Sequence, residues 1–415
     1  MTAITRSDDV RRQNRRLVIS VLRGGERLSR TDIAARTGLS PSTVSAITSD
    51  LIGEAILREN RDVDLTSTRR GRPQVALGLN PDAAGIIAVV LSLNSLSAAL
   101  IGYAGDIVVN EQVRLETLTL SREDLAEATR AMVGRLLAHA AAMDLRVPRI
   151  AFAVQGITDA SARKMMWSPI TPHDDIPFAD IIEDAFGVPV TVENDCNMIA
   201  LALRAKNPAR YGDNFIAILL SHGIGMGLML KGKLFMGTRS SGAEFGHMNH
   251  VPDGALCRCG RRGCVEAYAG NYAIARHARG LGDDVPPPSD VSDQEMLALA
   301  AAARAADGPE REAFRRAGEA IGFGLGSLFA LIDPAPVALI GQGALGFDLI
   351  EGPMRAAIAK TAGGQHHAIP SFETEPNEMP LIRAGCALKA LTQVDREIFA
   401  GGPLPAREEH DRAVA

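Results

Sequence analysis

Three cysteines and a histidine near the middle of the chain have the types and spacing of a metal site. Cys257, Cys259 and Cys264 lie in the run Cys-Arg-Cys-Gly-Arg-Arg-Gly-Cys, and His247 stands ten positions before the first of them. Thiolates are soft anions that repel one another, so a short loop that holds three of them beside an imidazole is best explained by a tetrahedral zinc ion. Four protein ligands leave no position for water, which predicts a structural zinc rather than a hydrolytic one.

A disulfide is the alternative interpretation of these cysteines. Three is an odd number, however, and a chain of 415 residues buries enough apolar surface without covalent cross-links. Gly260 and Gly263, inside the loop, would let the backbone turn tightly enough for the three sulfur atoms to face one point. Zinc is therefore the preferred assignment.

Acidic and amide side chains form a second group with possible chemistry. Asn194 and Asp195 follow a predicted strand and begin a predicted helix, where side chains can reach a ligand beyond the end of the strand. Glu244 and Glu266 stand on either side of the cysteine loop, and carboxylates placed in this way can accept hydrogen bonds from several sugar hydroxyls. The plainer alternative is that both glutamates face solvent beside a structural zinc.

A run of alternating glycines, Gly223-Ile-Gly-Met-Gly227, lies between two predicted strands. Bare glycines permit either a close approach of the backbone to a phosphate or a tight hairpin. The glycine signal alone is weak, and the hairpin is the better interpretation.

Residues 30–51 have the spacing of a helix-turn-helix. Ser40 is a good N-cap for a recognition helix over residues 41–51, which begins with a proline. Val44 and Ile47 are expected to face the core of this module. The outward hydroxyl side chains predicted to contact DNA are Ser42, Thr43 and Ser45.

An upstream helix, predicted near residues 9–22, carries a row of arginines. It is expected to bury Leu17, Val18, Val21 and Leu22 and to present Arg11, Arg12, Arg15 and Arg16. Residues 1–75 contain 14 Arg, no Lys and 9 Asp or Glu, a net charge of +5, so the remaining residues carry −10 of the total of −5. This asymmetry predicts a small polyanion-binding head on an acidic body. The alternative is a three-helix module with a solvated basic face.

Two short strands after the recognition helix, near residues 54–59 and 74–79, are predicted to form a wing. Its tip, residues 66–73, reads Thr-Ser-Thr-Arg-Arg-Gly-Arg-Pro. A narrow cationic segment of this kind fits the minor groove of DNA, which predicts contacts from Arg69, Arg70 and Arg72. The alternative is an interdomain linker whose charges aid solubility.

From about residue 85, apolar strands alternate with helices, which predicts an α/β body. We place the boundary between a domain of residues 1–80 and a domain of residues 81–415. A hydrophobic content of 46% is ordinary for a globular protein, and no apolar run approaches the roughly 18 residues of a membrane-spanning helix. The N-terminus lacks the pattern of a secretion signal, so the cytoplasm is the expected compartment and no membrane partner is expected.

Taken together, these residues resemble the ROK family of repressors, open reading frames and sugar kinases. The segment from Leu219 to His247 is similar to the family signature, and the segment from Cys257 to Glu266 is similar to its zinc motif. The resemblance implies a two-lobed, actin-like body of the sugar-kinase and ribonuclease H type, with a sugar between the lobes. It also implies an N-terminal winged helix-turn-helix, as in the family's repressor branch. By this resemblance the sugar-binding residues are Asn194, Asp195, Glu244, His247 and Glu266, and His247 also binds zinc.

Two departures separate the chain from the kinases of that family. Kinases carry an Asp-x-Gly-x-Thr phosphate loop on the first strand of the body, whereas residues 86–101 contain no Asp, Glu or Gly. Phosphoryl transfer then loses much of its electrostatic support, although Asp195 stands where family kinases hold their catalytic base. The second departure is the stretch Trp167-Ser-Pro-Ile-Thr, which offers no asparagine to the sugar.

The sequence therefore predicts a sugar-responsive transcriptional regulator, a repressor that binds operator DNA, and not an enzyme. One recognition helix reads too few base pairs to find an operator, so a homodimer or homotetramer is expected. Two alternatives remain open. One is an ATP-dependent sugar kinase with an appended DNA-binding domain, and the other is a constitutive DNA-binding protein whose body serves only to oligomerise.

Overall fold

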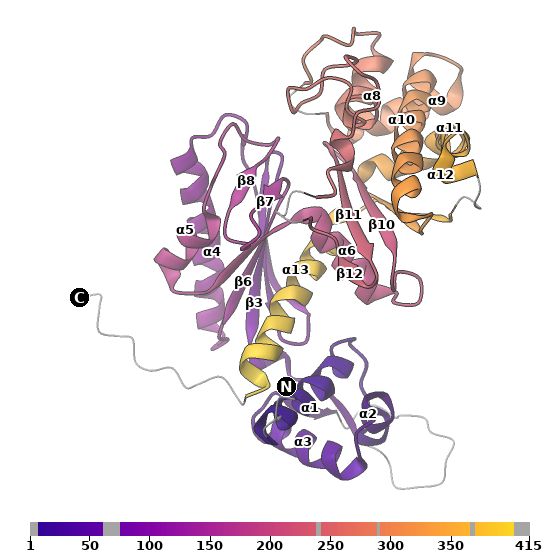
Figure 1. Ribbon diagram of the computed structural model, residues 1–415. Coiled ribbons are helices and arrows are strands. Elements are labelled where there is room, and N and C mark those ends of the chain that lie inside the picture. The colour runs from indigo at the N-terminus through magenta and orange to yellow at the C-terminus, as the bar shows by residue number, and fades with distance from the viewer. Residues whose placement is uncertain (1–6, 61–74, 238–241, 289–290, 366–369, 402–415) are drawn as a thin grey trace, which may run out of the picture.

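The computed structural model describes residues 7–60, 75–237, 242–288, 291–365 and 370–401. It consists of a small N-terminal head and a body of two lobes, with the head at one end of the body (Figure 1). The α/β class predicted for the body is confirmed. Within these residues no helix is both long and apolar enough to cross a membrane.

The head is a winged helix-turn-helix. Its elements are α1 (Ser7–Leu22), α2 (Arg30–Thr37), α3 (Pro41–Gly53), β1 (Leu57–Asn60) and β2 (Ala76–Leu79). Ser40 caps α3 by accepting a hydrogen bond from the backbone N–H of Thr43, and proline occupies the first turn as predicted. Val44 and Ile47 are buried, as predicted, and β1 pairs antiparallel with β2 to form the base of the wing.

The first lobe is built on a five-stranded sheet of order β5-β4-β3-β6-β9. Its elements are η1 (Pro81–Ala83), β3 (Gly85–Ser92), β4 (Ser95–Gly102), β5 (Ile107–Arg114), α4 (Arg122–Ala142), β6 (Arg149–Val154), β7 (Ile157–Thr158), β8 (Met165–Trp167), α5 (Phe178–Phe186) and β9 (Val190–Asn194). Strands β3, β4 and β6 are almost wholly buried, because elements cover both faces of the sheet. Helices α4 and α5 lie on the outer face (Figure 1).

The second lobe contains a second five-stranded sheet, of order β12-β11-β10-β13-β14. Its strands are β10 (Phe215–Leu220), β11 (Ile224–Leu230), β12 (Lys233–Leu234), β13 (Val337–Ile340) and β14 (Phe372–Glu375). The accompanying helices are η2 (Phe245–His247), α7 (Glu266–Ala269), α8 (Asn271–Ala278), α9 (Asp293–Ala305), α10 (Pro309–Ile332), η3 (Gln342–Gly346), α11 (Phe347–Ala359) and α12 (Ala362–Gln365).

The two sheets repeat one topology. In each, the first three strands are antiparallel neighbours, and the fourth and fifth join in parallel on the other side. Between the sheets lie α6 (Asp195–Lys206), packed on β10 and β11, and α13 (Glu378–Val394), packed on β3 and β6. These two helices touch closely at Gly385, where a Cβ atom would stand 2.0 Å from the carbonyl oxygen of Met198.

The orientation of α1 differs from the prediction. Arg15, expected at the surface with the other arginines of this helix, is buried at 4% exposure, and Leu17, expected in the core, is 37% exposed. Arg15 lies on the side of α1 that meets the body. There Glu54 and the backbone carbonyl of Phe399 accept hydrogen bonds from its guanidinium group, so burial costs less than it would for an unpaired charge. Phe399 belongs to η4 (Asp395–Phe399), the turn that follows α13.

Candidate ligand cleft and metal centre

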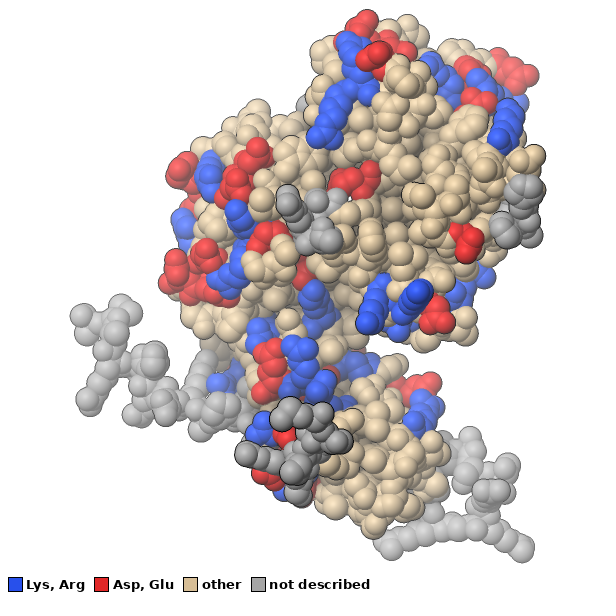
Figure 2. All heavy atoms as spheres, in the orientation of Figure 1, with Lys and Arg blue, Asp and Glu red and all other residues tan. Residues whose placement is uncertain are grey.

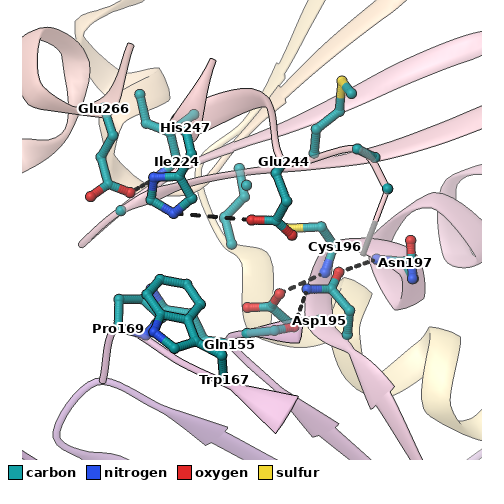
Figure 3. Close-up of a pocket in the computed structure, with 18 residues that line it drawn as sticks. Gln155, Trp167, Pro169, Asp195, Cys196, Asn197, Ile224, Glu244, His247 and Glu266 are labelled. Carbon is teal, nitrogen blue, oxygen red and sulfur yellow. Dashed lines mark hydrogen bonds and ion pairs between the residues drawn. The ribbon is translucent and has the colours of Figure 1, made fainter. Parts of the chain in front are cut away.

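A cleft between the two lobes collects polar side chains from segments far apart in the chain. It contains about 630 Å³ of unfilled space, part of it open solvent. The five residues predicted to contact a sugar all line it: Asn194, Asp195, Glu244, His247 and Glu266. They come from the end of β9, from the beginnings of α6 and α7, and from either end of η2, and Figure 3 shows most of them facing the same space.

Asn194 stands where β9 passes into α6. Its side chain accepts a hydrogen bond from the backbone N–H of Asn197 (3.0 Å) and donates one to the carbonyl oxygen of Gly156 (2.9 Å). The amide therefore fixes the junction of strand and helix, and it retains one N–H for a ligand.

Asp195 is buried, with 4% of its surface exposed, and accepts a hydrogen bond from the backbone N–H of Cys196 (2.8 Å). Burial raises the pKa of Asp195 to about 7, and the carboxylates of Glu378 and Glu244 add to the rise. A carboxyl group with this pKa changes protonation near neutrality. It can therefore either donate a hydrogen bond to a hydroxyl oxygen or accept one from a hydroxyl group.

Glu244 and Glu266 lie on either side of His247 in the cleft (Figure 3). Glu266 is only 2% exposed and accepts a hydrogen bond from the backbone N–H of Ile224 (3.0 Å), so it does not face bulk solvent. Burial raises the pKa of Glu244; the charge of His247 opposes this rise and that of Glu266 adds to it. The polar wall of the cleft therefore consists of two glutamates with an imidazole between them.

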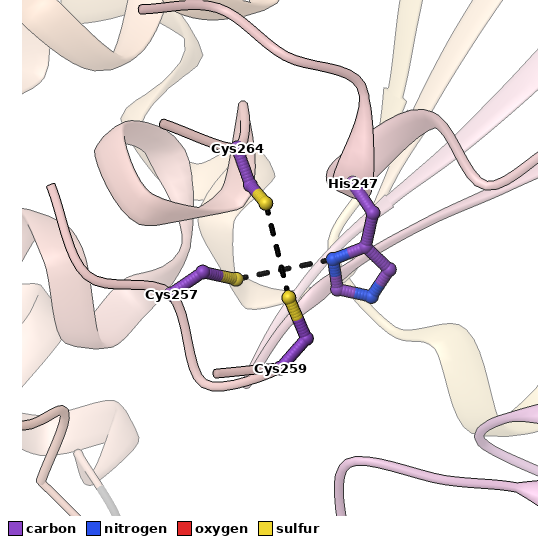
Figure 4. Close-up of side chains that lie close together, drawn as sticks. All are labelled: His247, Cys257, Cys259 and Cys264. Carbon is purple, nitrogen blue, oxygen red and sulfur yellow. Dashed lines mark hydrogen bonds between the residues drawn. The ribbon is translucent and has the colours of Figure 1, made fainter. Parts of the chain in front are cut away.

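The predicted metal ligands come together in the structure. One ligand atom from each of His247, Cys257, Cys259 and Cys264 lies within 4.8 Å of the others (Figure 4). The Sγ atoms of Cys259 and Cys264 are 3.8 Å apart, and Sγ of Cys257 is 3.9 Å from Nδ1 of His247. A tetrahedral zinc with Zn–S bonds of about 2.3 Å holds its sulfur ligands about 3.8 Å apart. All five cysteines are free thiols, so the cluster has the geometry of a zinc site and not of a disulfide.

The backbone of the cysteine loop turns at its two glycines, as predicted. Gly260 and Gly263 have φ angles of 81° and 77°, in the left-handed region that glycine adopts without strain. At Gly263 a Cβ atom would also lie 1.8 Å from the carbonyl oxygen of Val251. The hydroxyl of Tyr272 lies 3.5 Å from Sγ of Cys257 and 3.2 Å from Oε1 of Glu266, so it connects the loop to the cleft.

His247 belongs to both the metal centre and the cleft. Its Nδ1 faces the cysteines, whereas its Nε2 lies 4.0 Å from the carboxylate of Glu244. Burial would lower the pKa of His247, but hydrogen bonds to the sulfur atoms of Cys259 and Cys264 outweigh burial and raise it to about 10. The sulfur atoms thus favour a cation at this place, whether a proton or a metal. A metal on Nδ1 fixes the tautomer with a proton on Nε2, which then donates toward the cleft.

The glycine run begins in the turn after β10 and continues into β11. The two strands form a hairpin, as predicted, because they pair antiparallel from Phe215 with Met229 to Leu220 with Ile224. A Cβ atom on Gly225 would stand 2.3 Å from Sγ of Cys196. A Cβ atom on Gly227 would stand 2.3 Å from the backbone carbonyl oxygen of Cys196. These glycines therefore let α6 lie directly on β11, and this packing places Asp195 at the cleft.

In the head, Ser42 and Ser45 are exposed on α3, and Thr43 is half-buried. The hydroxyl of Ser40 lies 2.8 Å from that of Thr43 and 2.9 Å from that of Ser42, so both of these residues have a local partner. The predicted wing-tip residues Arg69, Arg70 and Arg72 lie outside the described residues. On the face shown in Figure 2, positive and negative side chains are mixed over both lobes and at the narrow join between body and head.

Several lining residues were not predicted as ligand contacts: Gln155, Trp167, Pro169 and Asn197. Trp167 is the only tryptophan in the chain, and an aromatic residue that ends a short strand is a signal that the sequence does contain. The resemblance places the stretch that begins at Trp167 at the sugar, but the hairpin of β7 and β8 was not predicted, so the indole itself was not expected as a ligand contact.

Known proteins share both parts of this molecule. The model of the ROK family matches residues 87–375. The chain belongs to the ROK family. A model described as winged helix-turn-helix DNA-binding matches residues 11–54, so the predicted resemblance is confirmed for body and head.

Relatives of this ROK protein include regulators and kinases. The xylose repressor of Bacillus subtilis (strain 168) is 25% identical over 368 residues, which are 87% of this chain and 91% of the repressor. The crystal structure of a ROK family transcriptional regulator, a homolog of the E. coli MLC protein, has a TM-score of 0.70 at 21% identity and covers 92% of this chain and 99% of its own. A ROK family glucokinase from Streptomyces griseus, in complex with glucose and AMPPNP, has a TM-score of 0.59 at 25% identity. The match covers 74% of this chain and 99% of the glucokinase.

Proposed function

We propose that this ROK protein is a sugar-responsive transcriptional repressor. Its head binds operator DNA, and a sugar in the cleft between the lobes changes that binding. The observation that carries the proposal is the meeting of Asp195, Glu244 and Glu266 in one cleft of a chain that also carries a winged helix-turn-helix. The similarity to the xylose repressor over most of both chains supports the same conclusion.

The lining of the cleft suits a polyhydroxy ligand. The carboxylates of Glu244 and Glu266 accept hydrogen bonds from hydroxyl groups, and such charge-assisted bonds are stronger than neutral ones. The imidazole Nε2–H of His247 donates between them. Bound zinc would hold the His247 ring in one orientation and one tautomer, so the metal has a structural role at the edge of the cleft.

Occupancy of the cleft must reach the head, and we propose that α13 is the connection. The first turn of α13 lies beside the cleft, where the carboxylate of Glu378 accepts a hydrogen bond from the hydroxyl of Ser221 (3.3 Å). Further along, Lys389 forms an ion pair with the buried carboxylate of Glu193, the residue directly before Asn194. The helix then runs toward the head and ends beside α1 (Figure 1).

At the far end of α13, a buried polar cluster joins the helix to the head. We call it the head–body junction, and its members are Arg15, Arg23, Glu54, Tyr103, Asp395 and Phe399. Arg23 forms an ion pair with Asp395 (2.5 Å), and both side chains are about nine-tenths buried, at 10% and 11% exposure. The hydroxyl of Tyr103 donates to the same carboxylate (2.5 Å), and the guanidinium of Arg23 lies 4.3 Å from the centre of the Tyr103 ring.

Because the junction is buried and charged, a shift at the end of α13 changes interactions that are strong in a medium of low dielectric. A sugar that binds one lobe arrangement better than the other would favour one position of α13, and therefore one position of the head. Two heads at a fixed spacing are needed to read an operator, so we further propose a homodimer or homotetramer that acts in the cytoplasm, where the operator lies.

A sugar kinase is the second candidate, because the glucokinase shares the fold of the body and Asp195 has a pKa near 7, which suits a base. Against it, the turn between β3 and β4 reads Leu91-Ser-Leu-Asn-Ser, without the aspartate and glycine that hold metal and phosphate in kinases. We therefore propose that the protein does not transfer phosphate.

Selection of binding sites from random duplex DNA, followed by fluorescence anisotropy on the selected site, tests the proposal. Neutral pyranoses added one at a time should change the affinity for that DNA at least about fivefold for one of them, the lower limit of typical coupling. Asp195→Asn should abolish the response while leaving DNA affinity without sugar unchanged. A protein that binds the site equally with every sugar would be constitutive, and formation of ADP from ATP and a sugar would establish the kinase instead.

A further inference from the structure

We infer that Trp167 is the platform on which the sugar ring stacks, and that it favours neutral pyranoses whose two C–H faces are both free of axial hydroxyls. The inference rests on the proposed function, since it concerns the ligand of the same cleft. It concerns the part of the cleft wall that β8 forms, for which neither the family signature nor the metal motif supplies a residue. Trp167 and Pro169 line the cavity drawn in Figure 3, and the ring of Trp167 lies beside that of His247.

The position of Trp167 is tightly constrained by the backbone. It ends β8, which pairs with β7 so that Trp167 stands opposite Ile157. A Cβ atom on Gly156 would lie 2.4 Å from the carbonyl oxygen of Trp167, so the two backbones are in direct contact. The hydroxyl of Ser168 also donates a hydrogen bond to the carbonyl of Gln155. The indole is therefore presented from a rigid hairpin rather than from a loop.

The contacts of the indole ring leave it available to a ligand. It contacts the ring of His247, with 5.7 Å between the ring centres and an angle of 78° between the planes. In the part of the chain that the structure describes, no group accepts a hydrogen bond from the indole N–H, and Trp167 is only half-buried. An aromatic side chain with an apolar body and an unused N–H commonly supplies both stacking and one hydrogen bond to a bound molecule.

The two walls of the cleft match the two kinds of surface on a sugar. A pyranose whose hydroxyls are all equatorial has axial C–H groups on both ring faces and hydroxyls around its rim. The C–H face can lie on the indole, while the rim reaches Asp195, Glu244 and Glu266. An axial hydroxyl interrupts one of the two faces, so such a sugar can lie on the indole only with its other face, and this limits how its rim can meet the carboxylates.

The charge of the lining favours a neutral ligand over a phosphorylated one. Three carboxylates line the cleft, and none of its described lining residues is a lysine or an arginine. A phosphate group would bring about two further negative charges toward Asp195, Glu244 and Glu266, and like charges repel strongly in a partly desolvated site. The inferred ligand is therefore an unphosphorylated sugar.

Because the chain contains one tryptophan, its fluorescence reports on Trp167 alone. The full-length protein is titrated with xylose and glucose, whose hydroxyls are equatorial, with galactose and mannose, which each carry one axial hydroxyl, and with glucose 6-phosphate. We expect xylose or glucose to change the emission and to bind more tightly than the axial sugars, which can stack by one face only. The phosphorylated sugar should bind weakly or not at all.

Variants separate stacking from folding. Trp167→Ala should bind the preferred sugar about tenfold more weakly in calorimetry and should lose the preference for equatorial hydroxyls, whereas Trp167→Phe should retain most of both. Leu331→Ala, at a side chain that is 81% exposed on α10, serves as the matched control and should change neither. If Trp167→Ala keeps the affinity and the preference, or if only the phosphorylated sugar binds, the inference is wrong although the repressor proposal stands. If no sugar binds and operator affinity never changes, the proposed function itself fails.

Discussion

The metal centre and the head–body junction are both polar and largely buried, yet they are assembled in opposite ways. The metal centre draws its four ligands from residues 247–264, a single short stretch of chain. The junction brings Arg15 and Arg23 from the head together with Tyr103, which directly follows β4, and with Asp395 and Phe399 of η4, across separations of up to 384 residues.

The difference indicates what each can contribute. A cluster within one short segment survives changes elsewhere in the molecule, and it stiffens one wall of the cleft. A cluster built from three distant elements depends on all of them at once, so a small movement of any element changes its energy. The first is suited to a fixed role and the second to transmitting a change.

The largest expected effect is that of Cys259→Ser, which removes one ligand from the metal centre. Zinc binding at a site of four protein ligands is worth roughly 10–16 kcal/mol, so losing one ligand should weaken it by about 3 kcal/mol, or at least 100-fold. Metal content measured by plasma mass spectrometry should fall from about one zinc per chain to near zero, and the sugar response should fall with it. Cys386→Ser, at a buried cysteine in α13 outside the cluster, should keep its zinc. A Cys259→Ser protein with full zinc would show that the cluster is not the metal site.

A second prediction concerns the junction, through Arg23→Met. Removing one partner of a buried ion pair costs about 3 kcal/mol, because Asp395 is left with an uncompensated charge. Sugar affinity and DNA affinity, each measured alone, should stay within about threefold of wild type, whereas the effect of sugar on DNA affinity should largely disappear. Arg11→Met, which breaks the exposed pair with Asp50, is the matched control and should preserve the response. An unchanged response in Arg23→Met would exclude the junction as the connection.

The smallest expected effect is a dependence of stability on pH that arises at Asp195. Burial raises its pKa in the folded protein to about 7 from a usual 3.8, so the folded state holds this proton more tightly than the unfolded chain. The contribution of Asp195 to stability is therefore largest below pH 4 and is lost as the pH rises through 7. Between pH 5.5 and 8 the wild type should lose about 2 kcal/mol more unfolding free energy than Asp195→Asn, as measured by urea denaturation. If both proteins lost the same unfolding free energy, a group other than Asp195 would be the one that titrates. Glu244 and Glu378 are examples, because burial also raises their pKa values.

Much of the local structure was predictable. The recognition helix begins where a serine cap and a proline occur in sequence, and the cysteine loop turns at Gly260 and Gly263. The hairpin at the alternating glycines was also predicted, but the sequence did not show why these positions must be glycine. Only the structure shows that Gly225 and Gly227 are bare because α6 lies against them.

Elements with weak patterns were missed for physical reasons. Helix α13 carries a glycine in its middle, which weakens the helical signal, and its contacts are with β3 and β6 from the other end of the body. Arg15 was expected at the surface because arginine usually is exposed, and its partners Glu54 and Phe399 lie 39 and 384 residues away.

The sequence by itself determined the parts that depend on near neighbours: the helix-turn-helix, the wing strands, the α/β class of the body, and the metal cluster. Their geometry follows from caps, turns and periodicity within a few residues. Only the tertiary structure decided that two sheets of one topology face each other across α6 and α13, that Trp167 lines the same cleft as the carboxylates, and that Arg15 and Arg23 turn inward. These outcomes depend on the packing of distant segments, and no spacing along the chain records which surfaces will meet.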